Sequence, residues 1–218
     1  MYSGRPRLID LFCGAGGCSV GYHRAGFDVV GIDLKPQKRY PFPFIQGDAM
    51  RPPVDLASFD AIHASPPCQR YSVATKVWKG RSEQHPDLVG ETRDMLRGSG
   101  RPWVMENVRS APFQGATMLC GTMFGLRVLR HRLFEGSFFL LAPPHTPHPK
   151  GNLTNAHRCY STGDSPFVCL AGHNFERKEG EKAMGIDWMG SRYELAQAIP
   201  PAYTEYIGRQ LMQVVQNG

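Results

Sequence analysis

The chain has 218 residues, of which 41% are hydrophobic and 20% charged, and it carries a formal net charge of +6. This balance is typical of a globular protein and excludes an intrinsically disordered chain. No apolar run approaches the ~18 residues that a membrane-spanning helix needs, so we expect no membrane association and a cytoplasmic location. The excess of basic residues favours a polyanionic partner. The six cysteines are expected to be reduced thiols, because nothing in the sequence indicates secretion.

Short apolar runs alternate with helix-like segments through the first half of the chain. The runs that favour strands are 7–12, 27–33, 59–65 and 101–108, and helices are predicted over 19–26 and 87–100. Such alternation predicts a parallel α/β sheet with right-handed crossovers. Residues 202–215 place apolar side chains four positions apart, which predicts a helix that packs one stripe on the core.

Residues 135–182 break this rhythm, because they are rich in proline, histidine and turn-forming residues. We interpret them as an insertion or a small second lobe. Four residues in this segment have the side chains of zinc ligands: His157, Cys159, Cys169 and His173. Their spacing matches no common structural zinc motif. The sequence therefore predicts no metal site.

The first predicted strand runs into "DLFCGAGG", residues 10–17, which is similar to a nucleotide-binding turn. Glycines there let the backbone approach a ligand at the switch from strand to helix. A dinucleotide-binding pattern would need glycine at the position of Ser19, so nicotinamide and flavin cofactors are disfavoured. Further along, Asp33 and Asp48 could accept hydrogen bonds from a ribose and from an adenine amino group. Each could instead be a turn or cap residue.

A cysteine, a glutamate and two arginines are the candidates for chemistry. In "ASPPCQRYS", residues 64–72, two prolines stiffen the turn that carries Cys68 at the end of a strand, where a nucleophile could lie. Core packing is the commoner role of a cysteine. Glu106 ends a largely apolar strand, so its carboxyl group needs a hydrogen bond or a proton. Arg130 and Arg132 alternate along an extended segment and point the same way, which suits a phosphate or a base oxygen. Solvent-facing surface positions are the alternative for all three charged residues.

The pattern as a whole resembles the cytosine-5 DNA methyltransferases. The segments "DLFCGAGG", "SPPCQRYS", "ENV", "LRHRLF" and "QAIPPAYTEYIG" occur in that family's order. The resemblance implies an S-adenosylmethionine-dependent methyltransferase (Rossmann-like) α/β sheet with a small recognition insertion. It implies a catalytic and cofactor-binding domain (1–134), a target-recognition insertion (135–182) and a C-terminal segment that returns to the catalytic domain (183–218). It also implies S-adenosylmethionine as cofactor and double-stranded DNA as partner of a monomer, in a bacterium or a phage-infected host.

The same resemblance implies a role for each candidate residue. Cys68 would add to carbon 6 of a flipped cytosine, and Glu106 would hold ring nitrogen 3 and the exocyclic amine. Arg130 and Arg132 would grip the base oxygen and keep Cys68 ionised. The cofactor would lie against Phe12, Gly14, Gly16, Asp33, Asp48 and Pro67. The DNA contacts would come from Gln69, Ser72, Lys76, Lys79 and Arg81, in a loop that closes over the base.

The chain also departs from the family pattern. Its insertion is short, so we expect a short or relaxed target sequence. "PPAY" stands where the closing motif usually has Asn-Ser, and Val128 stands where glutamine is more frequent. A cytosine-5 RNA methyltransferase and a non-catalytic protein that binds DNA and cofactor remain alternatives. Neither the target sequence nor a restriction partner is predicted.

Overall fold

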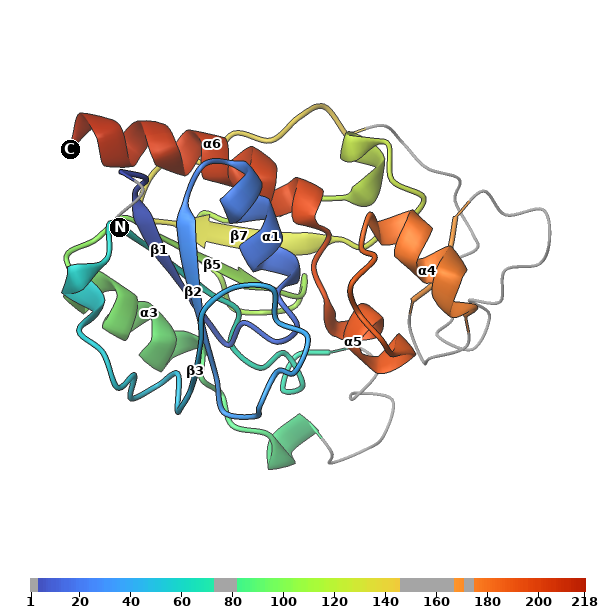
Figure 1. Cartoon of the computed structure of the whole chain (residues 1–218), viewed down its shortest axis with the longest axis horizontal. Coiled ribbons are helices and arrows are strands. Elements are labelled where there is room, and N and C mark those ends of the chain that lie inside the picture. Colours follow the sequence, from blue (N-terminus) through green and yellow to red (C-terminus); the bar gives the residue numbers. More distant parts are fainter. Residues whose placement is uncertain (1–3, 73–81, 146–166, 171–174) are drawn as a thin grey trace.

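A seven-stranded sheet with helices on both faces forms the centre of the computed structural model, which describes residues 4–72, 82–145, 167–170 and 175–218 (Figure 1). The strands are β1 (Arg7–Leu11), β2 (Asp28–Asp33), β3 (Phe44–Gln46), β4 (Ala61–Ala64), β5 (Trp103–Asn107), β6 (Thr117–Leu119) and β7 (Arg132–Gly136). The α-helices are α1 (Gly17–Arg24), α3 (Val89–Gly98), α4 (Arg177–Met184), α5 (Arg192–Gln197) and α6 (Pro201–Asn217). Short 3-10 helices lie at Leu56–Ser58, Ser82–Gln84 and Gly121–Phe124.

The strand order is β3-β2-β1-β4-β5-β7-β6. All neighbours are parallel except at β7, which runs antiparallel to both β5 and β6. The predicted α/β sheet is therefore confirmed, and each strand and helix expected in the first half lies where the apolar runs placed it. The four predicted strands are parallel to one another, and the antiparallel β7 was not among the predicted strands. A hairpin-like return, rather than a crossover helix, brings that strand back beside β5.

The central strands are apolar on both faces, which is why they read as continuous hydrophobic runs. Successive side chains of a strand point to opposite faces. Leu8 of β1 packs on the face covered by α1 and α6, whereas Ile9 packs on the face covered by α3. Both are fully buried, and each such side chain contributes about 1.5–3 kcal/mol by leaving water.

The predicted C-terminal helix is confirmed as α6, and it lies directly against α1 (Figure 1). Two glycines allow the close approach, because a Cβ at Gly21 would lie 2.1 Å from Thr204 Oγ1 and one at Gly208 would lie 2.6 Å from the Ala25 Cβ. The Thr204 hydroxyl also donates to the Cys18 carbonyl at 2.9 Å. The two ends of the described chain are thus joined on one face of the sheet.

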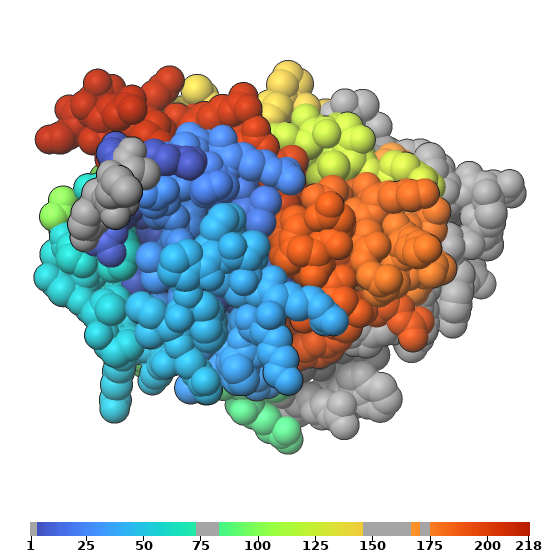
Figure 2. All heavy atoms as spheres, in the orientation of Figure 1, coloured from blue at the N-terminus to red at the C-terminus, as the bar shows by residue number. Residues whose placement is uncertain are grey.

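A smaller apolar cluster gathers residues that follow the sheet in sequence. It contains Val168, Leu170, Phe175, Met184, Met189 and Leu195, together with Val128. Figure 2 shows the segment around α4 and α5 beside the residues that follow β1 and β2. The indole Nε1 of Trp188 donates to the Ala15 carbonyl at 2.8 Å, which ties this cluster to the turn after β1. In the ranges that the structure describes, no helix has the length and apolar character to cross a membrane.

The expectation that all six cysteines are reduced is wrong at Cys169, which is disulfide-bonded. Four others, at positions 13, 18, 68 and 120, are free thiols.

Candidate active site

The glycine turn, residues 12–17, leads from β1 into α1 through a strained backbone. Phe12, Gly14 and Gly16 have φ of 59°, 50° and 87°, and Phe12 is the one residue other than glycine with positive φ in the described ranges. A non-glycine residue in this region is strained and often marks a functional turn. A Cβ added at Gly14 would meet nothing within 4 Å. The turn therefore offers open space where a ligand can approach the backbone.

Asp33 and Asp48 both brace the backbone at the carboxyl ends of two neighbouring strands, β2 and β3. Asp33, at the end of β2, accepts from the amides of Gly14 and Lys35, each at 3.0 Å. Asp48 accepts from the Met50 amide at 2.9 Å and so forms an Asx turn. The turn role that the sequence left open is present at both positions. A carboxylate has about four acceptor sites, so these bonds leave capacity for a ribose or an adenine amino group.

The turn that carries Cys68 is held from the neighbouring strand. Beyond β4, the Pro66 carbonyl accepts from Asn107 Nδ2 at 2.9 Å, and Asn107 ends β5 with only 1% of its surface exposed. The Asn107 Oδ1 accepts from the amide of Val108 at 2.8 Å, which fixes the orientation of the amide group. Cys68 is a half-buried free thiol on this turn. It therefore lies at the carboxyl edge of the sheet, as the sequence predicted, between the ends of β1 and β5.

Glu106 and Arg132 form a buried ion pair beside this turn. Arg132 Nε lies 3.1 Å from Glu106 Oε1, and the side chains are only 17% and 7% exposed. The pairing of β5 with β7 brings them together, because β7 starts at Arg132 and runs back along β5. Burial raises the pKa of Glu106 above its usual range, while Arg132, a hydrogen bond from Ser65 and Arg130 oppose the rise. A carboxyl group in this setting can hold a proton for a ligand.

Arg130 reaches the same site from just before β7. One of its terminal nitrogens donates to the Ala196 carbonyl at 2.6 Å, and the Tyr203 hydroxyl donates to the Arg130 carbonyl at 2.7 Å. Its Nε is buried and has no hydrogen-bond partner among the described residues. Burial, followed by the charge of Arg132, lowers the pKa of Arg130 to about 9. A buried donor without an acceptor costs about 1–3 kcal/mol, so this nitrogen is suited to an acceptor on a ligand.

The protonation of Cys68 differs from the sequence expectation. Arg132 and Arg130 do lower the pKa of the thiol, as expected. Burial and the negative charge of Glu106 outweigh them, so the pKa of Cys68 lies above its ordinary value. The arginines therefore do not keep the thiol ionised in the ligand-free protein. The sequence could not show this result, because it depends on how deeply the turn is buried.

The remaining predicted site residues divide into two groups. Pro67 and Ser72 are half-buried next to Cys68, and Gln69 is exposed. Lys76, Lys79 and Arg81 lie outside the described residues, as do His157, Cys159 and His173 of the rejected zinc pattern. The disulfide of Cys169 removes that thiol from the metal ligands considered in the sequence.

Two buried polar groups of the site were missed. Asp10 of β1 accepts from the Ser19 hydroxyl, and burial raises its pKa to about 7. His63 of β4 contacts the Tyr22 hydroxyl at 2.9 Å and the Ser65 hydroxyl at 3.0 Å, and burial lowers its pKa to about 3. Both stand as single polar residues within apolar strand runs, which was the available indication in the sequence.

The fold and the site together define a class of protein. A sheet in the order 3-2-1-4-5-7-6 with an antiparallel seventh strand, and a glycine turn after β1, is the S-adenosylmethionine-dependent methyltransferase fold. Solved structures share it. The chain aligns over 98% of its length with all of a candidate DNA modification methyltransferase encoded within a prophage (E. coli), with TM-score 0.66 and 14% identity. It aligns over 97% of its length with 99% of the S. pombe Dnmt2 methyltransferase, with TM-score 0.62 and 13% identity.

Sequence comparisons narrow the class. The family model for C-5 cytosine-specific DNA methylases matches residues 6–111. The chain is 29% identical over 148 residues to the type II methyltransferase M.XorII of Xanthomonas oryzae, covering 60% of this chain and 31% of that protein. It is 31% identical over 121 residues to the type II methyltransferase M.AquIA of Picosynechococcus, covering 47% and 48%. These alignments span less than half of either relative. Over residues 6–111, the chain is therefore similar to the C-5 cytosine-specific DNA methylases.

Proposed function

We propose that the protein is a DNA (cytosine-5)-methyltransferase that transfers a methyl group from S-adenosylmethionine to carbon 5 of a cytosine flipped out of duplex DNA. One observation carries the proposal: the free thiol of Cys68 lies at the same sheet edge as the buried Glu106–Arg132 pair and next to the glycine turn. A nucleophile, a proton donor and a cofactor turn are the three parts that the chemistry needs.

The residues of the glycine turn fit S-adenosylmethionine. The open space at Gly14 would let the cofactor approach the main chain. The carboxylate of Asp33, beside it, would accept hydrogen bonds from the ribose. The other contacts would come from Phe12, Gly16, Asp48 and Pro67. The bound cofactor supplies a methyl group activated by a sulfonium ion.

The chain's own residues would activate the cytosine. The Cys68 sulfur forms a bond to carbon 6, and the electron pair of the 5,6 double bond becomes available at carbon 5. Protonated Glu106 donates to ring nitrogen 3 and accepts from the exocyclic amine, which offsets negative charge in the ring. Once carbon 5 carries the methyl group, a base such as water removes its proton, the double bond re-forms and the Cys68 thiolate leaves.

The raised pKa of Cys68 fits this order of events. In the ligand-free protein, burial and then the charge of Glu106 raise the pKa of the thiol. When Glu106 carries a proton, that repulsion is removed, and the two arginines then oppose burial alone. Arg130 and Arg132 would then grip the base oxygen, with the unpartnered Nε of Arg130 as a donor. Binding of the base would in this way promote the thiolate.

The target sequence should be short or relaxed, of about two to four base pairs. A well-placed bidentate contact discriminates a base by ~1–3 kcal/mol, and a stringent site needs several. Residues 135–196 must supply both connections and recognition, and many are proline or glycine. Phosphate contacts would then supply most of the affinity, with Gln69, Ser72, Lys76, Lys79 and Arg81 as the proposed DNA-binding residues and with steep salt dependence.

Bisulfite sequencing of plasmid DNA from cells that express the chain tests the proposal. We expect methylated cytosines in a short sequence context with the wild type and none with Cys68→Ala. Incubation of the purified chain with RNA distinguishes the RNA-directed alternative. Methylation of RNA alone, or none of either nucleic acid with a folded and cofactor-binding protein, would contradict the proposal.

A further inference from the structure

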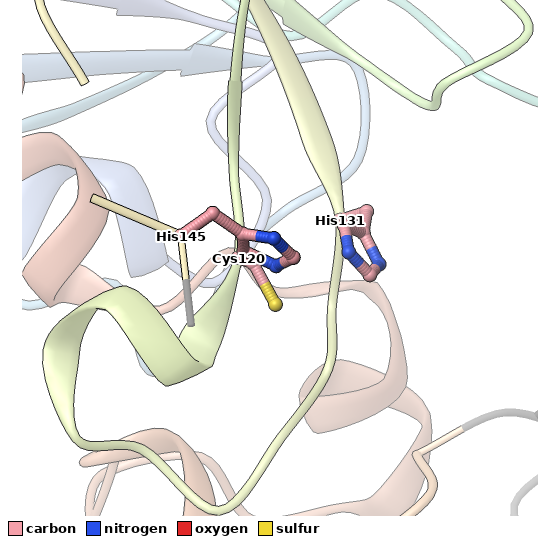
Figure 3. Close-up of side chains that lie close together, drawn as sticks. All are labelled: Cys120, His131 and His145. Atoms are coloured by element: carbon pink, nitrogen blue, oxygen red, sulfur yellow. The ribbon is translucent and has the colours of Figure 1, made fainter. Parts of the chain in front are cut away.

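Three side chains with metal-binding atoms meet where β6 ends and β7 begins. They are Cys120, His131 and His145, here called the Cys–His cluster (Figure 3). The thiol sulfur and one nitrogen of each ring all lie within 4.8 Å of one another. We propose that this cluster binds a divalent transition-metal ion, for which Zn²⁺ is the best match.

The strand pairing explains why two of these residues meet. β6 and β7 are antiparallel, and Leu119 is opposite Arg132. One further step along each chain brings Cys120 opposite His131. Successive side chains of an extended segment alternate, so His131 points away from the side that Arg130 and Arg132 share. His131, which lies between the two arginines in sequence, thus faces a different site.

His145 reaches the cluster from the segment that returns after β7. Its ring centroid is 5.6 Å from that of His131, with an angle of 61° between the ring planes. Figure 3 shows the His145 side chain extending toward Cys120, with His131 on the other side. Three stretches of chain that are separate in sequence therefore converge through side chains that can all donate to a metal.

The donor set selects the kind of metal. One thiolate and two imidazoles suit Zn²⁺ and related borderline-soft ions. None of the described residues adds a carboxylate to the cluster, which disfavours Mg²⁺ and Ca²⁺. Zinc bonds of about 2.0–2.3 Å place tetrahedral ligand atoms roughly 3.3–3.6 Å apart. The ligand atoms of the cluster are therefore up to ~1 Å further apart than in a zinc site. Small side-chain rotations about χ1 and χ2 can close this difference. The fourth position would take water or a further donor.

The surroundings of Cys120 support a ligand role. The residue is fully buried, and the Thr122 hydroxyl donates to its sulfur at 3.3 Å. A donor to the sulfur orients it, as outer contacts of metal sites do. A bound ion would join the end of β6, the start of β7 and the returning segment. It would thereby fix the strand that presents Arg130 and Arg132, whether or not the protein transfers methyl groups.

Metal analysis of the purified full-length chain tests this proposal without any substrate. The protein is prepared without a histidine tag, incubated with Zn²⁺, dialysed and measured by inductively coupled plasma mass spectrometry. We expect one zinc ion per chain in the wild type and in His23→Asn, a control on helix α1. We expect loss of the ion in His145→Asn, which replaces a proposed ligand that is not buried, and in Cys120→Ser. Chelation should lower the melting temperature of the wild type and not of His145→Asn.

Cobalt reports the ligands directly. Co²⁺ bound to the wild type should give a thiolate-to-metal absorption band in the near ultraviolet, and His145→Asn should lose it. Should Cys120→Ser fail to fold, the His145 variant still decides the result. A wild type without zinc after dialysis, or a His145→Asn protein that retains as much zinc as the wild type, would overturn the site. Either result leaves the proposed methyl transfer untouched, because that depends on Cys68 and is measured separately.

Discussion

The two halves of the sheet's carboxyl edge are built in different ways. On the β1–β2 side, Asp33 accepts from main-chain amides, and its partners Gly14 and Lys35 lie within 19 residues of it. On the β4–β5–β7 side, Asn107 reaches Pro66 across 41 residues and Arg130 reaches Ala196 across 66. Apart from the Trp188 bond to the Ala15 carbonyl, the first half uses local backbone geometry. The second uses buried side chains from distant segments.

The groups proposed for the chemistry all lie in the second half. Burial shifts the pKa values of Cys68, Glu106 and Arg130 away from their ordinary ranges. Such shifts are what acid–base and nucleophilic chemistry requires, whereas cofactor binding needs shape and hydrogen bonds. The comparison indicates that substitutions in the second half should change the chemistry, and substitutions in the first should change cofactor affinity.

Cys68→Ala is expected to have the largest effect. Loss of the nucleophile should lower methyl transfer by roughly 10⁴-fold or more, with cofactor affinity unchanged. Transfer of labelled methyl groups to DNA and calorimetric titration of the cofactor measure the two quantities. In the wild type, DNA that contains 5-fluorocytosine should trap a covalent complex. A large loss of cofactor affinity in the variant would break the division between the two halves.

Glu106→Gln should lower the chemical rate by ~10² or more, because glutamine is a poor proton donor. It should also lower the pKa of Cys68, since the charge that raises it is removed. The rate of alkylation of the ligand-free protein as a function of pH reports that pKa. The profile should move to lower pH in Glu106→Gln and to higher pH in Arg132→Ala, where an opposing charge is lost. Equal profiles in all three proteins would mean that these charges do not reach the sulfur.

Asn107→Ala tests the long-range support of the Cys68 turn. Removing the buried donor leaves the Pro66 carbonyl without it and should destabilise the protein by about 1–3 kcal/mol. We expect kcat to fall about tenfold while the KM for cofactor stays constant. Gln114→Ala, which removes an exposed amide that accepts from Arg97, is the matched control and should change neither. Denaturant unfolding and steady-state kinetics give the values, and a constant kcat would make the contact purely structural.

Asp33→Asn should have the smallest effect. Asparagine can still accept from the Gly14 amide, so the turn is kept, but the charge is lost. We expect cofactor affinity to weaken about three- to tenfold and the alkylation profile of Cys68 to stay the same. Calorimetry and the same alkylation assay measure both. A shifted Cys68 profile would show that the halves are coupled through more than the cofactor.

The difference between the halves also explains what the sequence could predict. β1, the glycine turn and β2 follow one another closely in sequence. Their apolar runs and glycines were therefore enough to predict them. The turn at Cys68 and the apolar strand that ends at Glu106 were likewise visible as local patterns. Asn107 lies within a quoted motif, yet its role depends on where the Pro66 carbonyl lies in space.

Features that depend on β7 could not be predicted in this way. Alternating strands and helices predict parallel strands, and the antiparallel direction of β7 departs from this pattern. Strands of three residues, such as β6, have too few residues to show a detectable hydrophobic pattern. The meeting of Cys120 with His131 follows from that pairing and from no spacing motif. The raised pKa of Cys68 depends on burial, which the residues next to the cysteine in sequence do not determine.

The hydrogen bond from Trp188 to the Ala15 carbonyl affects when the glycine turn can be completed during synthesis of the chain. Its two partners are separated by 173 residues, and ribosomes add about 5–20 residues per second. Roughly 10–35 s therefore pass between synthesis of the glycine turn and synthesis of its brace. Contacts so distant in sequence form late and slow the folding of a domain. Capture of a cofactor by the finished turn should thus be one of the last events in the biosynthesis of this protein.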